Sequence, residues 1–174
     1  MNDVQVVAQV REGKADAFGK IVERYQLPIV RYVYRITGDY EVAKDLAQDT
    51  FVMAYKGILK TDSNLSFKAW LYRIATNNAR QYNRRRRLLS FIPFSKVAER
   101  SPIFQAPPGQ IEDKLIIKQV LSKISHGQRI CLILHFIEGF KYSEIADILG
   151  ITKYAVSKRV ARGSKQFQIL YGGG

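Results

Sequence analysis

The amino-acid sequence predicts an all-α protein with two small helical domains, residues 1–89 and 110–174, joined by an extended linker over residues 90–109. Apolar residues recur every three or four positions through both domains, which is the period of an amphipathic helix. No alternation typical of a strand continues for a useful length. In the linker this periodicity is lost, and four of the five prolines of the chain stand there. Since proline interrupts both helices and sheets, an extended segment is expected between the domains.

The first domain is expected to hold a short helix before Gly13 and three longer helices, over residues 17–36, 40–56 and 67–89. Asp16 can cap the first long helix, and Pro28 is expected to kink or split it. Thr37-Gly38-Asp39 supplies a stop followed by a new cap. Residues 60–66, KTDSNLS, are polar and are predicted to form a loop.

The second domain is expected to contain helices over residues 111–124, 128–137, 142–149 and 152–171. Gly150 suits a tight turn with positive φ, and Thr152 suits the cap of the helix that follows. A short helix, a glycine turn and a second helix with a basic outer face indicate a helix-turn-helix that enters a DNA major groove. An ordinary helical hairpin is the alternative. The side chains expected on the outer face are Lys153, Tyr154, Ser157, Lys158, Ala161 and Arg162.

The helix over residues 40–56 directs acidic and amide side chains outward, although the chain as a whole is basic. Its apolar positions alternate with Glu41, Asp45, Gln48 and Asp49. Carboxylates repel DNA, so this face favours contact with another protein. A solvated face explains this helix alone equally well.

The next helix combines aromatic, cationic and amide side chains and then runs into four arginines. Such a combination suits unstacked bases and phosphates, because aromatic rings stack on bases and cations bind the backbone. Trp70 can serve as a stacking platform, or it can belong to the core with Leu71, Ile74 and Ala75. The run Arg84-Arg85-Arg86-Arg87 can be a nonspecific anchor for DNA or a solvated helix end.

The charge of the chain points to a polyanionic partner. Its 174 residues carry 28 Lys and Arg against 15 Asp and Glu, a net charge of +13, with a pI of about 9.9. Both halves are basic: residues 1–89 have a net charge of +7 and residues 90–174 of +6. Nucleic acid is the common partner of such a protein.

Several other classes of protein are excluded or disfavoured. The longest apolar stretch, residues 130–137, is far too short to cross a bilayer, and no secretory signal is evident, so a cytoplasmic protein is expected. A single cysteine, Cys131, excludes an intrachain disulfide framework and a Cys-rich zinc site. His126 and His135 have no metal-ligand constellation around them. Without a phosphate loop or a nucleophile elbow, we expect neither an enzyme nor a bound cofactor.

Three motifs follow one another in the chain and cover most of it outside the linker. They are Thr37-Gly38-Asp39 with Asp45-Leu46-Ala47-Gln48-Asp49-Thr50-Phe51, the segment from Phe67 to Asn77 that runs into the arginines, and the segment from Glu138-Gly139-Phe140 to Gly150-Ile151-Thr152. In these motifs the chain resembles bacterial RNA polymerase sigma factors of the extracytoplasmic-function (ECF, group IV) type, in the sigma-70 family.

The resemblance implies a role for each part of the chain. Residues 1–89 would bind the clamp of the polymerase β′ subunit and melt the −10 element. Residues 110–174 would read the −35 element beside the flap of the β subunit. The linker would thread through the polymerase, and an anti-sigma factor is a candidate partner. The resemblance also implies that the protein directs promoter-specific transcription initiation as part of the polymerase holoenzyme.

The family motifs also imply site residues. Those for polymerase binding are Asp45, Gln48 and Asp49. Those for the single-stranded −10 element are Asp62, Ser63, Asn64, Trp70, Asn77, Asn78, Gln81, Arg84, Arg85, Arg86 and Arg87. Those for the −35 duplex are Lys153, Tyr154, Ser157, Lys158, Arg159 and Arg162. Gly163 departs from the Ala common in the family and is expected to weaken its helix by about 0.5–1 kcal/mol.

Two alternatives belong to other functional classes. One is a helix-turn-helix regulator that binds duplex DNA without polymerase. The other is an interaction protein whose basic faces hold acidic proteins. An acidic helix next to a base-stacking helix argues against both.

Overall fold

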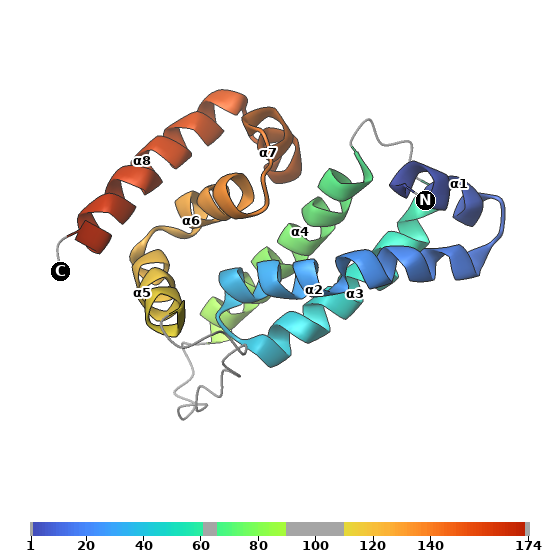
Figure 1. Cartoon of the computed structure of the whole chain (residues 1–174), viewed down its shortest axis with the longest axis horizontal. Helices are drawn as coiled ribbons and strands as arrows, with labels where there is room; N and C mark the ends of the chain where they lie inside the picture. Colours follow the sequence, from blue (N-terminus) through green and yellow to red (C-terminus); the bar gives the residue numbers. More distant parts are fainter. Residues whose placement is uncertain (1, 61–65, 90–109, 173–174) are drawn as a thin grey trace. The chain divides into compact units, whose positions relative to one another are not determined.

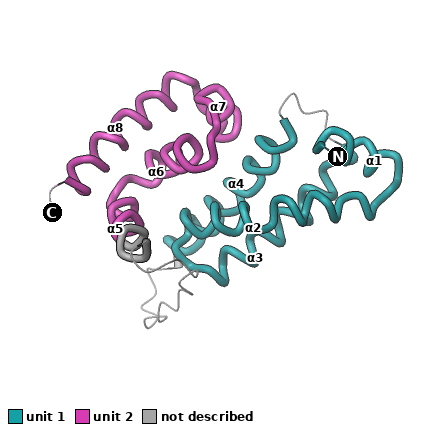
Figure 2. The backbone as a smooth tube through the Cα atoms, viewed as in Figure 1, with its two compact units in different colours: residues 1–100 teal, residues 101–174 magenta. Residues whose placement is uncertain are grey.

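A computed structural model describes residues 2–60, 66–89 and 110–172 of the chain. Every regular element in these ranges is helical, and no strand occurs in them. The chain divides into two compact units, residues 1–100 and 101–174 (Figure 2). The all-α class with two helical units is therefore confirmed. The predicted linker lies outside the described residues, and so do the loop residues Asp62, Ser63 and Asn64 that are predicted to contact DNA.

In its described residues, the first unit contains four α-helices and one short 3-10 turn (Figure 1). They are α1 (Asp3–Arg11), η1 (Ala15–Ala17), α2 (Phe18–Thr37), α3 (Tyr40–Ile58) and α4 (Phe67–Leu89). The helices α2, α3 and α4 pack against one another in pairs and enclose the core. Fully buried side chains from all three meet there, among them Ile29, Tyr32, Ala43, Ala54, Leu71 and Tyr72.

Local chemistry explains where α2 ends and α3 begins. Gly38 ends α2 in the left-handed region at φ 77°, and its N–H bonds the carbonyl of Tyr34. The Asp39 carboxylate then accepts the backbone N–H of Val42 at 3.1 Å. Thr37-Gly38-Asp39 thus acts as the predicted stop and cap.

One expectation for α2 was wrong, and one of the two outcomes expected at Pro28 is excluded. Asp16 does not cap it, because Asp16 lies within η1, whose chain runs directly into the helix without a side-chain cap. The helix is also not split at Pro28, since α2 continues through that residue. Tyr25, Ile29 and Tyr32 are buried on either side of Pro28. Their packing compensates for the one backbone hydrogen bond that proline removes.

The short helix α1 is held on the bundle by its first residues. Asp3 pairs with Arg24 and accepts the hydroxyl of Tyr25, both on α2. Burial, and then the hydrogen bond to Asp3, raises the pKa of the Tyr25 hydroxyl. At its other end, the Arg11 guanidinium donates to the carbonyl of Ile58 at 3.0 Å.

The second unit contains α5 (Gln110–Lys123), α6 (His126–Leu132), η2 (Ile133–Ile137), α7 (Tyr142–Leu149) and α8 (Lys153–Gly172). One helix was expected over residues 128–137. Instead α6 passes into the π-helical segment η2, whose wider turn moves Phe136 and Ile137 to the surface. The helix α8 packs against α5, α6 and α7. Across the described residues, no helix combines the length and apolar character that spanning a membrane requires.

Candidate nucleic-acid and protein interfaces

The outer face of α3 is acidic, as predicted. Asp45, Gln48 and Asp49 are all exposed, while Ala43 and Ala47 on the opposite side are buried. Near the start of the helix, Glu41 pairs with Lys44 at 2.8 Å, and this hydrogen bond raises the pKa of the Lys44 ammonium. Neither Asp45 nor Asp49 forms an ion pair with another described residue, so both carboxylates are available to a partner.

Next to this acidic face lies a groove that the sequence interpretation missed. It has a volume of about 540 Å³ and lies between α2 and α3, with Phe18, Val30 and Phe51 among its lining residues and Gln48 also lining it. On α3, Val52 and Met53 are 47% and 51% exposed. They follow Asp49 by three and four positions, a spacing that could have revealed an apolar continuation of the acidic face. An apolar surface with a charged edge is typical of a protein interface.

Four of the predicted base-binding side chains of α4 form one row on its outer side. Trp70, Asn77, Gln81 and Arg84 are separated by seven, four and three positions, which brings them to one face of a helix. Asn77, Gln81 and Arg84 are exposed. Trp70 is half-buried, with its ring 5.7 Å from that of Phe67. Trp70 therefore packs on one side and remains accessible on the other.

Asn78 does not belong to this row, contrary to the expectation from the family motif. It is 9% exposed, and its side-chain amide donates to the hydroxyl of Thr50 on α3 at 3.1 Å. Asn77 and Asn78 are one residue apart, about 100° around the helix, so only one of them can share the direction of Trp70 and Gln81.

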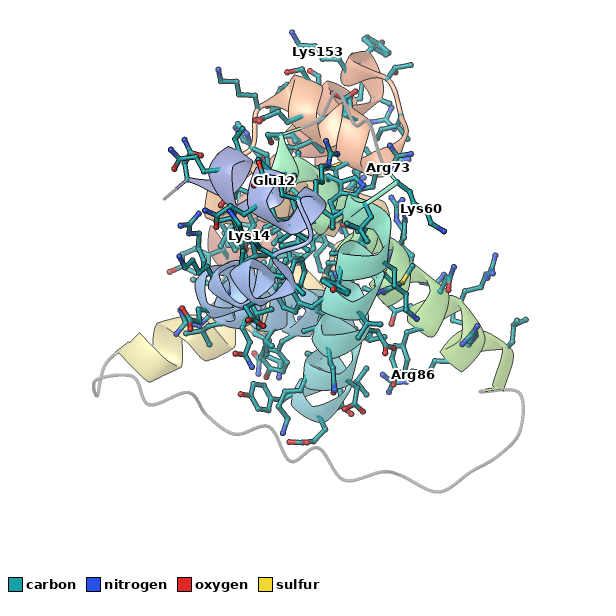
Figure 3. All side chains as sticks on the ribbon, turned by 90° about the vertical axis from the view of Figure 1, so that its right-hand side faces the viewer. Glu12, Lys14, Lys60, Arg73, Arg86 and Lys153 are labelled. Carbon is teal, nitrogen blue, oxygen red and sulfur yellow. The ribbon has the colours of Figure 1, made fainter. Side chains whose placement is uncertain are left out.

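The arginine run occupies the last turns of α4. Arg84, Arg85, Arg86 and Arg87 are all exposed. Figure 3 labels Arg86 near this end of the helix and Lys153 at the start of α8. Four cations on one exposed helix end attract a phosphate backbone.

The helix-turn-helix geometry in the second unit agrees with the prediction in detail. Gly150 adopts φ 64° between α7 and α8, and the Thr152 hydroxyl accepts the backbone N–H of Ala155 at 3.1 Å. Ile145, Ile148 and Leu149 of α7 are buried, as are Val156 and Val160 of α8. The exposed side chains on the outer face of α8 are Lys153, Tyr154, Ser157, Lys158, Ala161 and Arg162.

Comparison with known proteins identifies the two units. The family model described as sigma-70 region 2 matches residues 21–88, and that described as sigma-70 region 4 matches residues 114–167. The ECF RNA polymerase sigma factor SigW of Bacillus subtilis is 30% identical over 168 residues, which cover 90% of each chain. The chain belongs to the ECF sigma factors of the sigma-70 family. It directs transcription initiation with its region 2 and region 4 units.

Other relatives agree with this assignment. The RNA polymerase sigma factor CnrH of Cupriavidus metallidurans is 29% identical over 178 residues, covering 95% of this chain and 92% of CnrH. A solved structure of CnrH in complex with the cytosolic domain of CnrY superposes with a TM-score of 0.75 and 26% identity, covering 98% and 97% of the two chains. The sigma factor RpoE of Bartonella quintana, solved with the anti-sigma factor NepR, has the same fold, with a TM-score of 0.71.

In this sigma factor, Arg159, which the family motif assigned to the −35 duplex, is not fully exposed on α8. It is half-buried, and its guanidinium lies against Gly127 of α6. A Cβ at Gly127 would come within 3.3 Å of the Arg159 Nη1. Gly127 therefore leaves room for a side chain that ties α6 to α8, a role that sequence spacing between distant helices could not reveal.

Gly163 has a packing role that offsets its low helix propensity. It is buried in α8, and a Cβ there would come within 3.1 Å of Leu132 Cδ1 and 3.3 Å of Gln128 Cβ on α6. This is tighter than an ordinary van der Waals contact of about 3.5–4.0 Å. The glycine thus allows the close approach of α6 and α8 in region 4.

The histidines and the cysteine have structural surroundings. His135 Nδ1 lies 2.9 Å from the carbonyl of Phe140, and its ring packs between those of Phe136 and Tyr142. Cys131 is fully buried. Within the described ranges, no group of three or more His, Cys, Asp or Glu side chains is arranged to hold a metal ion.

Proposed function

We propose that this sigma factor binds core RNA polymerase through the outer face of α3 and reads a promoter with both units. The row Trp70, Asn77, Gln81 and Arg84 on α4 would hold the unpaired nontemplate strand of the −10 element. The outer face of α8 would lie in the major groove of the −35 element. The observation that carries the proposal is that one unit exposes both an acidic, partly apolar face on α3 and an aromatic, amide and cationic row on α4.

The two surfaces suit different partners for physical reasons. Asp45 and Asp49 repel a phosphate backbone and attract a basic protein surface, here the clamp of the β′ subunit. On α4, stacking of a base on an aromatic ring such as Trp70 contributes about 1–3 kcal/mol. This is comparable to the few kcal/mol that unstacking one base costs. Capture of unpaired bases can therefore offset local melting of the duplex.

The direct test is reconstitution with core RNA polymerase from the same cell. We expect the holoenzyme to initiate at discrete sites on genomic DNA, mapped from the 5′ ends of the transcripts, where core polymerase alone initiates without preference. Tight, specific binding of the free protein to duplex DNA, with no effect on polymerase, would instead indicate a self-sufficient helix-turn-helix regulator.

The arginine run is expected to contact phosphates rather than bases. Replacing Arg85 and Arg86 by Gln should weaken binding to promoter DNA across sequences and lower the slope of log K against log salt by about 0.9 for each lost duplex phosphate contact. The measurement is a salt titration of DNA binding by the holoenzyme. A matched control replaces Lys14 and Lys20, two exposed cations of the same unit, by Gln. Equal slopes in both variants would mean that the arginines only face solvent.

We also propose domain limits of 1–89, 90–109 and 110–174, since both family matches fall inside the two outer ranges. In this arrangement the linker threads through the polymerase, region 4 lies beside the flap of the β subunit, and the protein acts in the cytoplasm. An anti-sigma factor is a further proposed partner, supported by the complex of the relative CnrH with the cytosolic domain of CnrY. Affinity purification from the native cell, followed by mass spectrometry, should recover polymerase subunits and such a regulator.

A further inference from the structure

Two buried hydrogen bonds hold α4 from opposite sides, at the positions before and after Asn77. Thr76 is fully buried, and its hydroxyl lies 2.7 Å from the hydroxyl of Tyr32 on α2. Asn78 donates its side-chain amide to the hydroxyl of Thr50 on α3 at 3.1 Å. One bond therefore ties α4 to α2, and the other ties it to α3.

In each bond, the threonine hydroxyl also forms a hydrogen bond to a backbone carbonyl of its own helix. The Thr50 hydroxyl donates to the carbonyl of Leu46 at 2.7 Å, and the Thr76 hydroxyl reaches the carbonyl of Tyr72 at 2.6 Å. Thr50 is fully buried. Because an unsatisfied polar group in a core is costly, these side chains strongly prefer the one arrangement in which all of them are bonded.

The two bonds select one rotation of α4. Successive helical residues turn by about 100°, so Asn77 projects on the side opposite to the core that Thr76 and Asn78 flank. Apolar burial is not directional and tolerates small rotations of a helix. A hydrogen bond weakens steeply when its distance or angle changes, so rotation or sliding of α4 would disrupt both bonds. Asn77 and the row that contains it are thereby held outward.

The Thr50–Asn78 bond also connects the two surfaces of the unit by a short path. Thr50 follows Asp49 on α3, and Asn78 follows Asn77 on α4. The exposed carboxylate of Asp49 and the exposed amide of Asn77 are thus separated by two backbone steps and one side-chain hydrogen bond.

We infer that Thr50 and Asn78 are positioning residues for promoter opening. This inference rests on the proposed function. The hydrogen bond between Thr50 and Asn78 would orient the base-binding row on α4 relative to the outer face of α3, which binds polymerase. Preorganised contacts bind more tightly because less freedom is lost on binding. Without the bond, α4 would present the row over a range of rotations and capture unpaired bases more slowly. The outer face of α3 would keep its side chains and its affinity for polymerase.

The test compares four variants in reconstituted holoenzyme at saturating sigma factor. T50V removes the hydroxyl at nearly constant volume, T50S retains it, N78A removes the amide, and T50V/N78A removes both partners. Opening is followed by fluorescence of 2-aminopurine placed in the −10 region of a promoter that the wild-type holoenzyme uses. Affinity for core polymerase and thermal unfolding are measured in parallel.

We expect T50V and N78A to slow opening about tenfold, with non-additive effects in the double variant, as is usual for directly bonded residues. T50S should open the promoter within about twofold of the wild-type rate, and core affinity should change by no more than about twofold in any variant. On a promoter already unpaired at the −10 element, the defect should shrink to about twofold, because the cost of unstacking is removed.

The double variant separates positioning from simple stabilisation. It leaves no buried polar group unsatisfied, so it should fold even if a single variant does not. Opening at the wild-type rate by T50V/N78A, or a loss of opening that only follows lost core affinity, would overturn the inference. Failure of the wild-type holoenzyme to initiate at any promoter would instead refute the proposed function.

Discussion

Reversing the charges of Asp45 and Asp49 together should weaken binding to core RNA polymerase by about a hundredfold, or tenfold for each site, because each change replaces an attraction by a repulsion. Both carboxylates are exposed on α3 and form no ion pair within the described chain. Lysine at either position retains a helix-forming side chain, so the fold should be preserved. The measurement is titration of labelled D45K/D49K sigma factor with core polymerase at two salt concentrations.

The matched control is E12K/E23K, which makes the same change in net charge at exposed positions of the first unit outside α3. The control should bind polymerase within about twofold of wild type, since surface charges far from an interface are screened by salt. Equal affinities of D45K/D49K and wild type would remove the acidic face from the proposed interface and would favour its interpretation as a solvated surface.

Replacing Lys158 and Arg162 by Ala should abolish preference for the −35 element while leaving polymerase affinity unchanged. Both side chains are exposed on the outer face of α8, and the Lys158 ammonium lies 5.3 Å from the ring centre of Tyr154. A good base contact in the major groove contributes about 1–3 kcal/mol, so loss of two should weaken specific binding by about a hundredfold or more.

The measurement is competition between the promoter duplex and a duplex with a scrambled −35 element, using holoenzyme at fixed salt. K118A/K123A, which removes two exposed cations of α5, is the matched control and should retain the preference. If K158A/R162A weakened both duplexes equally, the two side chains would contact phosphates and not bases.

Apolar periodicity and capping residues were sufficient to predict the position of most of the helices. The predicted range of 67–89 matches α4, and that of 142–149 matches α7. In both, apolar periodicity is strong, and the turn between α7 and α8 has a glycine and a cap whose chemistry depends on neighbouring residues alone. The change from the α-helix α6 to the π-helical η2 could not be predicted. The apolar residues of 128–137 follow the spacing of an ordinary α-helix, and nothing in that spacing indicates a wider turn.

The candidate sites were predictable in their residue types and less so in their geometry. Motif spacing selected Asn77 and Asn78 together, and only the packing of α4 on α3 shows that Asn78 is turned inward. Arg159 was similarly grouped with the residues for the −35 duplex, although its guanidinium lies against Gly127 of α6. In both cases the contacting residue is distant in sequence. The periodicity of one helix does not indicate which other helix its side chains contact.

The sequence was sufficient to predict the helical class, the helix-turn-helix, the acidic face of α3 and the resemblance of the chain to a family of transcription initiation factors. These depend on periodicity, on caps and on motifs, all of which are local along the chain. Only the packing of the helices shows that an apolar groove lies beside the acidic face, that Gly163 permits close packing of α6 and α8, and that Thr50 and Asn78 join two helices. Such features arise where separate helices meet, and that contact is set by the burial of whole faces and not by any single segment.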